Sequence, residues 1–532
     1  MTPIPRRRTR PRPALILLGA LTAALVALPL VFVMAEATSG GLGRAGFLLA
    51  RPKVVELLGN TARLVIAVTV LSVVLGTVTA WLTECTDLPG APLWRVLLVL
   101  PVAIPEFVSG YAWVSFTSTV RGFGGAVLIS TMSLYPLVYL PVVAMLRRRD
   151  PTQDDVARSL GLTDAQVIRR VVIPTLRPAM LAGALIVSLH LLGEYGAFSI
   201  VRYPTFATEI VTEYDIGFDP AAAGMLSMVL VVLCSTILAA ESRAAGATTY
   251  ARIGAGAARP SAPARLGRAL PLALASLTGL AALALGVPVA TLGYWLLNGG
   301  STTLPPASIW SATSTTLLLS LAAAGASTLC ALPVALLAVR YRTRLTLLLE
   351  RGAYTARALP GAVVALALVF FALRYAPPLY QSIPLLITSY VVLFLPLALT
   401  AIRAVLVQIP ARLAEIGEGL GVGRGQVLIR ITLPLLAPGL GAGAALVFLA
   451  TATELTSTLL LRPTGLETLA TQFWVYLTGL AYGAAAPYAA LMIAVSAGPT
   501  YFLTRWQPST ATAAAPFTTP ERAAPAGLVG AS

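Results

Sequence analysis

The chain has 532 residues, of which 57% are hydrophobic and only 11% charged, and this composition excludes a soluble globular protein. Its net charge of +16 comes from arginine, because Lys53 is the only lysine. If the N-terminus is cytoplasmic, most of these arginines fall in inner loops, as the positive-inside rule requires. Topology therefore accounts for the charge, and nucleic acid is not expected as a partner.

Long apolar stretches recur along the whole chain, each near the 20 or so residues that a helix needs to cross about 30 Å of hydrocarbon. They are continuous rather than alternating, which favours helices over a closed β-barrel. We therefore predict an all-α integral membrane protein with about twelve transmembrane helices, at residues 14–35, 62–82, 95–116, 124–146, 179–201, 222–240, 270–296, 314–339, 356–374, 383–402, 439–461 and 482–503.

The first apolar stretch follows a run of three arginines, Arg6 to Arg8, and precedes Ala35-Glu36-Ala37. This pattern has two interpretations, a cleavable signal peptide or a retained first helix. An apolar stretch of about 20 residues is long for a signal peptide, so we predict a retained helix behind a basic cytoplasmic N-terminus.

A cytoplasmic segment of about thirty residues separates the fourth and fifth stretches, far more than a helical hairpin needs. A short helix is predicted to end at Gly161, because glycine readily adopts the left-handed conformation that caps helices. Thr163 and Gln166 then have the spacing of a capping box, which predicts a second short helix. Pro174 here, and Pro434 in a similar segment later in the chain, are predicted to end that helix before the fifth span. Two short helices joined by such an elbow would project as a knob suited to a partner's groove.

Acidic residues inside a membrane span are costly in lipid and usually face the bundle interior or water. Glu194 in the fifth span is such a residue, and His190 lies one helical turn before it, on the same face. Together with Tyr195 and Glu454, its counterpart later in the chain, they are candidates for the translocation path. The alternative is that each carboxylate hydrogen-bonds helix backbone or a nearby hydroxyl, and both interpretations stay open.

Other site chemistries find little support in the residues. His190 is the only histidine, which excludes multi-histidine metal sites, and no metal site is assigned. A serine–histidine hydrolase would need a partner serine that nothing marks out. The three cysteines share no metal or redox spacing and are interpreted as small apolar residues; they are Cys85, Cys234 and Cys330.

The loop after the fifth span gathers acidic residues on the outer side. A docking surface for a delivery protein is one interpretation, and solvated loop charge is the favoured one. The residues are Glu209, Glu213, Asp215 and Asp219.

The second part of the chain repeats the first with a shift of 260 residues. Leu160-Gly161 matches Leu420-Gly421, Ala182-Gly183-Ala184 matches Ala442-Gly443-Ala444, and Glu194 matches Glu454. Because each half has an even number of spans, the repeats are parallel in topology. The predicted organisation is a cytoplasmic N-terminus at 1–12, a first half at 13–240, a cytoplasmic linker at 241–268, a second half at 269–506 and a disordered tail at 507–532.

Nucleotide binding by the chain itself is not predicted. A P-loop needs a glycine-rich turn closing on a lysine, and Lys53 follows Arg51-Pro52 instead. No buried strand precedes the spaced glycines of the second half, so a dinucleotide fingerprint is also excluded.

Both long inner loops resemble the conserved loop of binding-protein-dependent permeases of ABC importers. In that family the loop reads E-A-A, three residues, G, nine residues, then I-x-L-P. The residues of this chain that carry the resemblance are Asp155, Val156, Ala157, Gly161 and Pro174 in the first half, and Glu415, Ile416, Gly417, Gly421 and Pro434 in the second.

The resemblance implies that these loops are coupling helices that dock onto two ABC ATPase subunits, which would use ATP and Mg, while this chain binds no cofactor and is not an enzyme. It also implies an extracytoplasmic substrate-binding protein as partner. The location implied is the lipid bilayer of a bacterial plasma (inner) membrane, with both termini cytoplasmic.

The segment from Gly193 to Phe198, with Glu454-Leu455-Thr456 and Leu459 to Gly465 in the second half, looks like that of fused iron(III) permeases. The resemblance implies ferric iron as cargo, and Fe³⁺ favours carboxylate and phenolate ligands such as Glu194, Tyr195 and Glu454. Permeases for thiamine, polyamine or phosphonate share related designs and remain alternatives. A different class, an ion-coupled secondary transporter with His190 among its proton sites, also stays open.

Overall fold

The structure is a computed structural model that describes residues 13–39, 46–47, 50–148, 152–215, 217, 219–245, 263–299, 307–341, 343–354, 356 and 359–505. Within these residues every regular element is a helix, apart from one isolated bridge between Thr86 and Ala264. The predicted all-α fold is therefore confirmed. The predicted N-terminal segment 1–12, residues 246–262 of the linker and the tail 507–532 lie outside the described residues.

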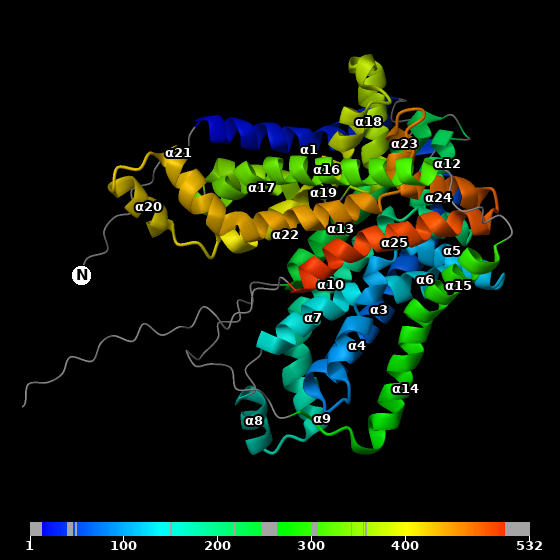
Figure 1. Cartoon of the computed structure of the whole chain (residues 1–532), viewed down its shortest axis with the longest axis vertical. Helices are drawn as coiled ribbons and strands as arrows, with labels where there is room; N and C mark the ends of the chain where they lie inside the picture. The colour runs from blue at the N-terminus through cyan, green and yellow to red at the C-terminus, as the bar shows by residue number, and fades with distance from the viewer. Residues whose placement is uncertain are drawn as a thin grey trace, which may run out of the picture.

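The first half contains two long helices, a broken span, a span made of two consecutive helices, a helical elbow and two further long helices (Figure 1). Its elements are α1 (Pro13–Ser39), α3 (Pro52–Cys85), α4 (Ala91–Leu97), η1 (Leu100–Ala103), α5 (Glu106–Phe116), α6 (Gly122–Leu134), α7 (Pro136–Arg148), α8 (Thr152–Ser159), α9 (Asp164–Val167), η2 (Ile168–Val172), α10 (Ile173–Gly193), α11 (Gly196–Ile200), α12 (Phe206–Asp215) and α13 (Pro220–Ala245).

The second half repeats this order of elements. They are η3 (Gly267–Ala269), α14 (Leu270–Ala281), η4 (Ala282–Gly286), α15 (Val287–Asn298), α16 (Ala307–Arg340), α17 (Arg344–Tyr354), α18 (Gly361–Tyr375), η6 (Pro377–Leu379), α19 (Ile383–Leu406), α20 (Ala411–Gly419), α21 (Arg424–Val427), η7 (Leu428–Thr432), α22 (Leu433–Ala452), α23 (Thr456–Leu461), α24 (Leu469–Thr478) and α25 (Tyr482–Arg505).

Among the described residues, nine helices are long and apolar enough to cross a membrane, and a bent pair makes a tenth candidate, which is compatible with the predicted twelve. Several predicted spans are not continuous helices. The span predicted at 95–116 bends by 93° before Glu106, where Pro105 cannot donate a backbone hydrogen bond. The spans predicted at 179–201 and 439–461 break between α10 and α11 and between α22 and α23.

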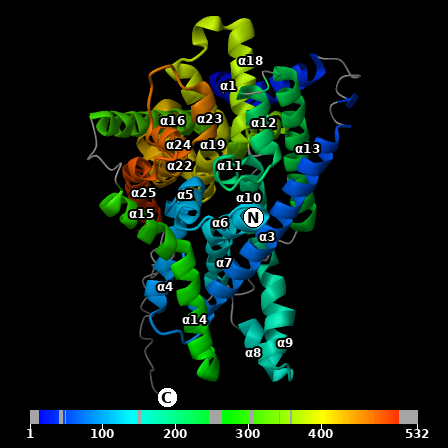
Figure 2. The same ribbon diagram turned by 90° about the vertical axis from the view of Figure 1, so that its right-hand side faces the viewer.

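The first helix of each half packs on the other half. Helix α1 contacts α16, α17 and α18 as well as α13 of its own half, and α15 contacts α5 as well as α25 (Figures 1 and 2). Helices α1 and α15 occupy equivalent places in the two halves, so each half makes the same kind of contact with the other. Because each half contributes a helix to its neighbour's packing, the halves are interlocked rather than merely adjacent.

Two glycines explain the repeated Ala-Gly-Ala motif. A β-carbon on Gly183 of α10 would lie 2.8 Å from the Cα atom of Val138 in α7, and one on Gly443 of α22 would lie 3.1 Å from the Cα atom of Ala398 in α19. The contacted residues are themselves 260 positions apart. Membrane helices approach each other closely where the interface residues are small, so the motif marks a packing contact present in both halves.

Replacing Gly183 with alanine is expected to lower the free energy of unfolding by about 1–3 kcal/mol, because the added methyl group meets backbone that cannot rotate away. Gly279 of α14 is the matched control, since a β-carbon there meets nothing within 4 Å. The same change at Gly279 should be neutral or stabilising by up to about 1 kcal/mol. Thermal unfolding of the two variants in detergent checks this, and equal midpoints would contradict the close-packing argument.

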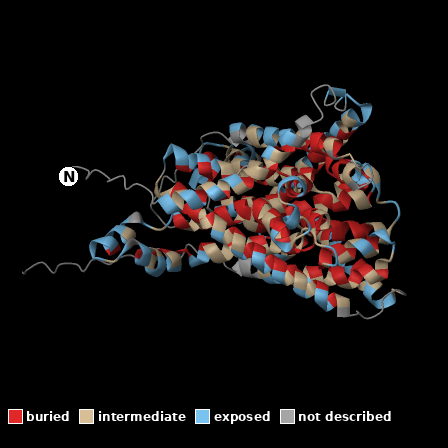
Figure 3. Ribbon diagram, turned by 90° about the horizontal axis from the view of Figure 1, so that it is seen from above, coloured by how far each residue is buried: buried red, intermediate tan, exposed pale blue. Residues whose placement is uncertain are grey.

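Buried residues concentrate in the interior of the helical bundle, and exposed residues cover its outside (Figure 3). On α3 and α16 the exposed side chains include large apolar ones, among them Ile66, Val70 and Val74, and Leu318, Leu321 and Leu329. In a membrane these side chains contact acyl chains, while the helices satisfy their own backbone hydrogen bonds.

Candidate functional site

The first elbow is formed by α8 and α9 around Gly161, whose φ of 85° is in the left-handed region. The Gly161 N–H donates to the Arg158 carbonyl oxygen at 2.9 Å, and the Leu162 N–H donates to the Ala157 carbonyl oxygen at 3.2 Å. This pair of bonds is the Schellman arrangement that closes a helix on a glycine. The predicted glycine cap is therefore confirmed.

The second elbow, between α20 and α21, has the same geometry. Gly421 has a φ of 83°, its N–H donates to the Glu418 carbonyl oxygen at 3.0 Å, and the Val422 N–H donates to the Gly417 carbonyl oxygen at 3.1 Å. The matching bonds lie 260 residues apart, so the repeat preserves an exact chain reversal and not only a sequence pattern.

The second short helix of the first elbow begins with the predicted capping box. The Thr163 N–H donates to Gln166 Oε1 at 3.0 Å, and the Gln166 N–H donates to Thr163 Oγ1 at 3.4 Å. Gly423 occupies the place of Thr163 in the second elbow and brings no side chain to the cap.

Each elbow has one position where only a small side chain fits. Ala157 is buried, and a β-carbon on its counterpart Gly417 would lie 3.1 Å from both Val427 Cγ2 and Ile431 Cδ1. The first short helix therefore rests directly on the helix that follows the elbow. A larger side chain would push the two apart, which explains a small residue at the third motif position in both copies.

The remaining motif residues face outward. Val156 and Leu160 of the first elbow and Ile416 and Leu420 of the second are all exposed, with Leu160 at 77% and Leu420 at 79%. Asp155 pairs on the surface with Arg158 at 3.3 Å, and Glu415 is also exposed. Figure 1 shows α8–α9 and α20–α21 standing off from the bundle at two separate places. Each elbow thus presents apolar side chains on a rigid projection.

The predicted role of Pro174 and Pro434 is wrong. Neither proline ends a helix; each lies in the first turn of a long helix, α10 or α22, that continues from the elbow through a π-helical turn, η2 or η7. In η2 the Ile173 N–H donates to the Ile168 carbonyl oxygen, five residues back. Such a widened turn accommodates a proline, which has no N–H and whose ring would clash in a regular helix.

Glu194 and Glu454 lie at the breaks in the fifth span of each half, not inside a continuous helix. Glu194 Oε1 accepts a hydrogen bond from the Ala197 N–H at 2.8 Å, and Glu454 Oε1 accepts one from the Ser457 N–H at 3.0 Å. Each carboxylate therefore caps the short helix that follows it. One oxygen of each glutamate therefore has the backbone-bonding role named as the alternative, while Oε2 of Glu194 faces His190.

Glu106, which the sequence reasoning missed, lies at the centre of the polar site. It begins α5, is buried, and its Oε2 lies 2.9 Å from His190 Nε2, while Ser130 Oγ donates to its Oε1 at 2.5 Å. His190 Nε2 is 3.8 Å from Glu194 Oε2, as the predicted spacing allows. The sequence does indicate Glu106 as a candidate, because it is an acidic residue within the predicted span 95–116.

The polar site lies where the two halves touch. A β-carbon on Gly193 would lie 3.5 Å from Pro360 Cβ, and one on Gly196 would lie 3.0 Å from Leu455 Cδ2. The ring of Tyr195, the remaining candidate, packs against the Trp474 ring of α24 with centroids 5.4 Å apart. Tyr195 is thus oriented by an aromatic contact across the interface between the halves.

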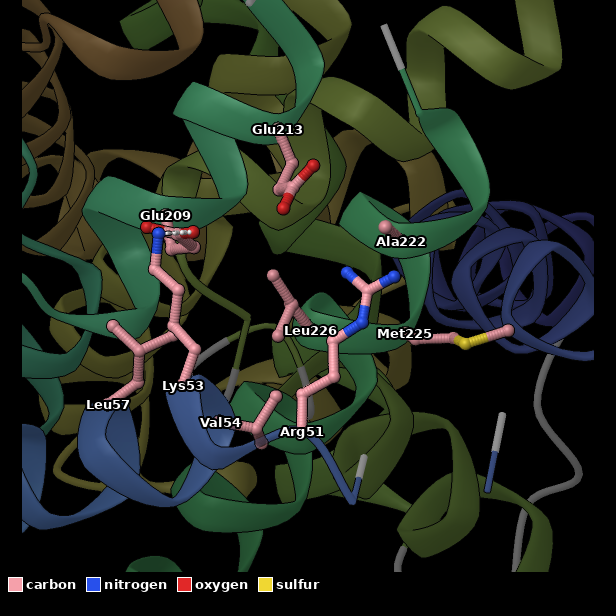
Figure 4. Close-up of a pocket in the computed structure, with 9 residues that line it drawn as sticks. All are labelled: Arg51, Lys53, Val54, Leu57, Glu209, Glu213, Ala222, Met225 and Leu226. Carbon is pink, nitrogen blue, oxygen red and sulfur yellow. Dashed lines mark ion pairs between the residues drawn. The ribbon is translucent and has the colours of Figure 1, made fainter. Parts of the chain in front are cut away.

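The acidic residues after the fifth span do not all lie in a loop, because Glu209 and Glu213 belong to α12, and the interpretation as solvated loop charge is wrong for Glu209. It lies in α12, is buried, and its Oε1 is 2.5 Å from Lys53 Nζ at the start of α3. Figure 4 shows Lys53 reaching Glu209, with Glu213 beside the same pocket. Asp219 Oδ1 accepts from the Ala222 N–H at 3.1 Å at the start of α13. Glu209 therefore joins α12 to α3, whereas Asp219 caps the first turn of α13.

Two homologous helical halves, a pair of matched elbows and a polar site at broken helices together define a multi-pass membrane transport subunit. The chain belongs to the family described as the binding-protein-dependent transport system inner membrane component, whose model matches residues 90–241 and 331–508. The resemblance identified from the two inner loops is thereby confirmed.

Relatives of both the fused and the single-half form are found. The chain is 38% identical over 484 residues to the Fe(3+)-transport system permease protein FbpB 2 of Haemophilus influenzae, which covers 90% of this chain and 95% of the relative. It is 28% identical over 203 residues to the sulfate transport system permease protein CysW of Escherichia coli K12, covering 35% of this chain and 70% of the relative. A match that covers about a third of this chain but most of the relative agrees with a chain made of two permease units.

Proposed function

We propose that this chain is the membrane permease of an ABC importer that carries ferric iron delivered by an extracytoplasmic binding protein. The similarity to a Fe(3+)-transport permease along 90% of the chain supports this assignment. Family membership supports a place in the bacterial plasma membrane, and the arginine distribution supports cytoplasmic termini.

The observation that carries the proposal is the pair of matched elbows. Each exposes an apolar side chain at the same place on the same rigid turn, Leu160 in the first and Leu420 in the second. Exposed apolar groups on a fixed projection favour docking into a groove of a partner. Two equivalent elbows suit two ATPase subunits, which would bind ATP and Mg while this chain binds no cofactor.

The charge of the polar site favours a cation as cargo. Glu106, Glu194 and Glu454 supply three carboxylates near the interface between the halves, and such a set repels sulfate or a phosphonate. Among cations, Fe³⁺ prefers hard oxygen ligands, whereas thiamine and polyamines are larger organic cations. The carboxylates therefore support ferric iron ahead of the alternatives.

Reconstitution with an ABC ATPase and an extracytoplasmic binding protein from the same organism tests the function. Uptake of radioactive iron into proteoliposomes is expected only when both partners, ATP and Mg are present. Thiamine and spermidine should neither be taken up nor compete. Iron uptake by the permease alone under a proton gradient would instead establish an ion-coupled secondary transporter, and ATP-driven uptake of thiamine or spermidine would overturn the iron assignment.

A further inference from the structure

A histidine and two carboxylates converge at the broken helices of the first half. Ligand atoms of Glu106, His190 and Glu194 all lie within 4.8 Å of one another. The residues come from two places, the start of α5 and the C-terminal end of α10, and one oxygen of each carboxylate approaches the same imidazole nitrogen, at 2.9 and 3.8 Å. This spacing is small enough for a single metal ion to bind all three after modest side-chain movement.

The two carboxylates are held in place by other groups. Ser130 Oγ donates to Glu106 Oε1, and the Ala197 N–H donates to Glu194 Oε1. In each glutamate the other oxygen, Oε2, is the one directed toward His190. Hydrogen bonds of this kind orient metal ligands and leave the binding oxygen free to coordinate.

The cluster can be reached by water and yet is largely enclosed. The His190 side chain is 44% exposed, whereas Glu106 and Glu194 are 3% and 13% exposed. A buried carboxylate and a second one that is only 13% exposed are costly in a membrane protein unless a cation compensates them, and imidazole is a common ligand for iron as well. The histidine therefore gives access to a site whose negative charge favours a highly charged cation.

The second half has no equivalent cluster at these positions. Gly361 takes the place of Glu106 at the start of α18, and Ala450 takes the place of His190. The Glu454 carboxylate fills the space above Gly361, where a β-carbon would lie 3.0 Å from its Oε1, and that oxygen also accepts from Ser457 Oγ. The two halves therefore differ in sequence at the positions that supply the cluster in the first half.

We propose that Glu106, His190 and Glu194 form a single metal-coordination site, on the first half only, that binds the ferric ion during its passage. The inference rests on the proposed iron transport. It adds a stoichiometry of one ion per chain, a defined ligand set that includes Glu106, and an asymmetric route along the first half. A cargo bound symmetrically between the two halves would instead need matching ligands from both of them.

Direct binding of gallium(III), a redox-inert analogue of Fe³⁺, tests the site. The full-length chain in nanodiscs is dialysed against gallium citrate, and bound metal is counted by mass spectrometry. One ion per chain is expected, with affinity lowered about ten- to hundredfold by Glu106→Gln or His190→Gln. Glu56→Gln, at an exposed glutamate of α3 outside the cluster, is the matched control and should leave binding unchanged.

Folding is checked in the same samples by thermal unfolding. His190 is partly exposed, so its glutamine variant should stay folded even if Glu106→Gln does not. Unchanged gallium binding in a folded His190→Gln variant, or two ions per chain, overturns the site. Iron uptake by the complete transporter is measured separately: uptake that survives both substitutions overturns the site alone, whereas a wild-type transporter that imports no iron overturns the proposed function.

Discussion

Replacing both Leu160 and Leu420 with aspartate is expected to separate this chain from its ATPase while leaving the membrane bundle folded. Both side chains are more than three-quarters exposed, so the change removes no internal packing. In a docked complex, however, each new carboxylate would lie unpaired against an apolar groove, which is strongly unfavourable. Association should weaken by at least about tenfold, and ATP-driven uptake should fall in parallel.

Copurification with the ATPase in detergent, followed by iron uptake in proteoliposomes, measures the effect. Leu480→Asp is the matched control, because Leu480 is 70% exposed and lies in the turn between α24 and α25, away from the elbows. The single variants should each show part of the loss, since the elbows are equivalent. If the double variant retains its ATPase and full uptake, the elbows are not the docking sites.

Replacing Glu194 with glutamine is expected to reduce iron uptake by about tenfold or more without unfolding the chain. Glutamine keeps a side-chain oxygen that can accept the Ala197 N–H, so the cap of α11 is preserved and only the charge is lost. The same change at Glu454 should have a smaller effect, because Ala450 stands where His190 lies in the first half. The double variant should lose nearly all uptake.

Alanine variants of Glu194 and Glu454, compared with the glutamine variants, distinguish a role of the negative charge from a role as helix cap. If the glutamates serve only as caps, Glu194→Gln and Glu454→Gln will transport normally, and only the alanine variants will fail, with lower unfolding midpoints. If the charge is required, the glutamine variants will fail while their unfolding midpoints and ATPase association stay unchanged. Normal uptake by the folded double glutamine variant would remove both residues from the translocation path.

The elbows could be predicted closely because their structure is local. Gly161 and Gly421 adopt positive φ, and the Thr163–Gln166 box forms, through contacts that span only a few residues. Pro174 and Pro434 were misinterpreted because a proline normally ends a helix. A π-helical turn immediately before each proline removes that conflict, and such turns leave no simple signature in the sequence.

The polar site was predicted only in part. The His190–Glu194 pair follows from helical spacing, and the equivalence of Glu194 and Glu454 follows from the repeat. Glu106 could be recognised as an acidic residue in a span, but its contact with His190 joins positions 84 residues apart. The breaks at Glu194 and Glu454 were also missed, because apolar composition measures the length of a span and not its continuity.

By itself, the sequence determined the membrane class, the duplication and the paired inner loops, because hydropathy, repetition and turn chemistry are properties of neighbouring residues. Only the tertiary structure decided that the first helices are exchanged between halves, that Gly183 and Gly443 mark close packing, and that Glu106 joins His190 and Glu194 on one half alone. These features depend on which helices lie side by side, and that choice is made by shape and packing over the whole bundle.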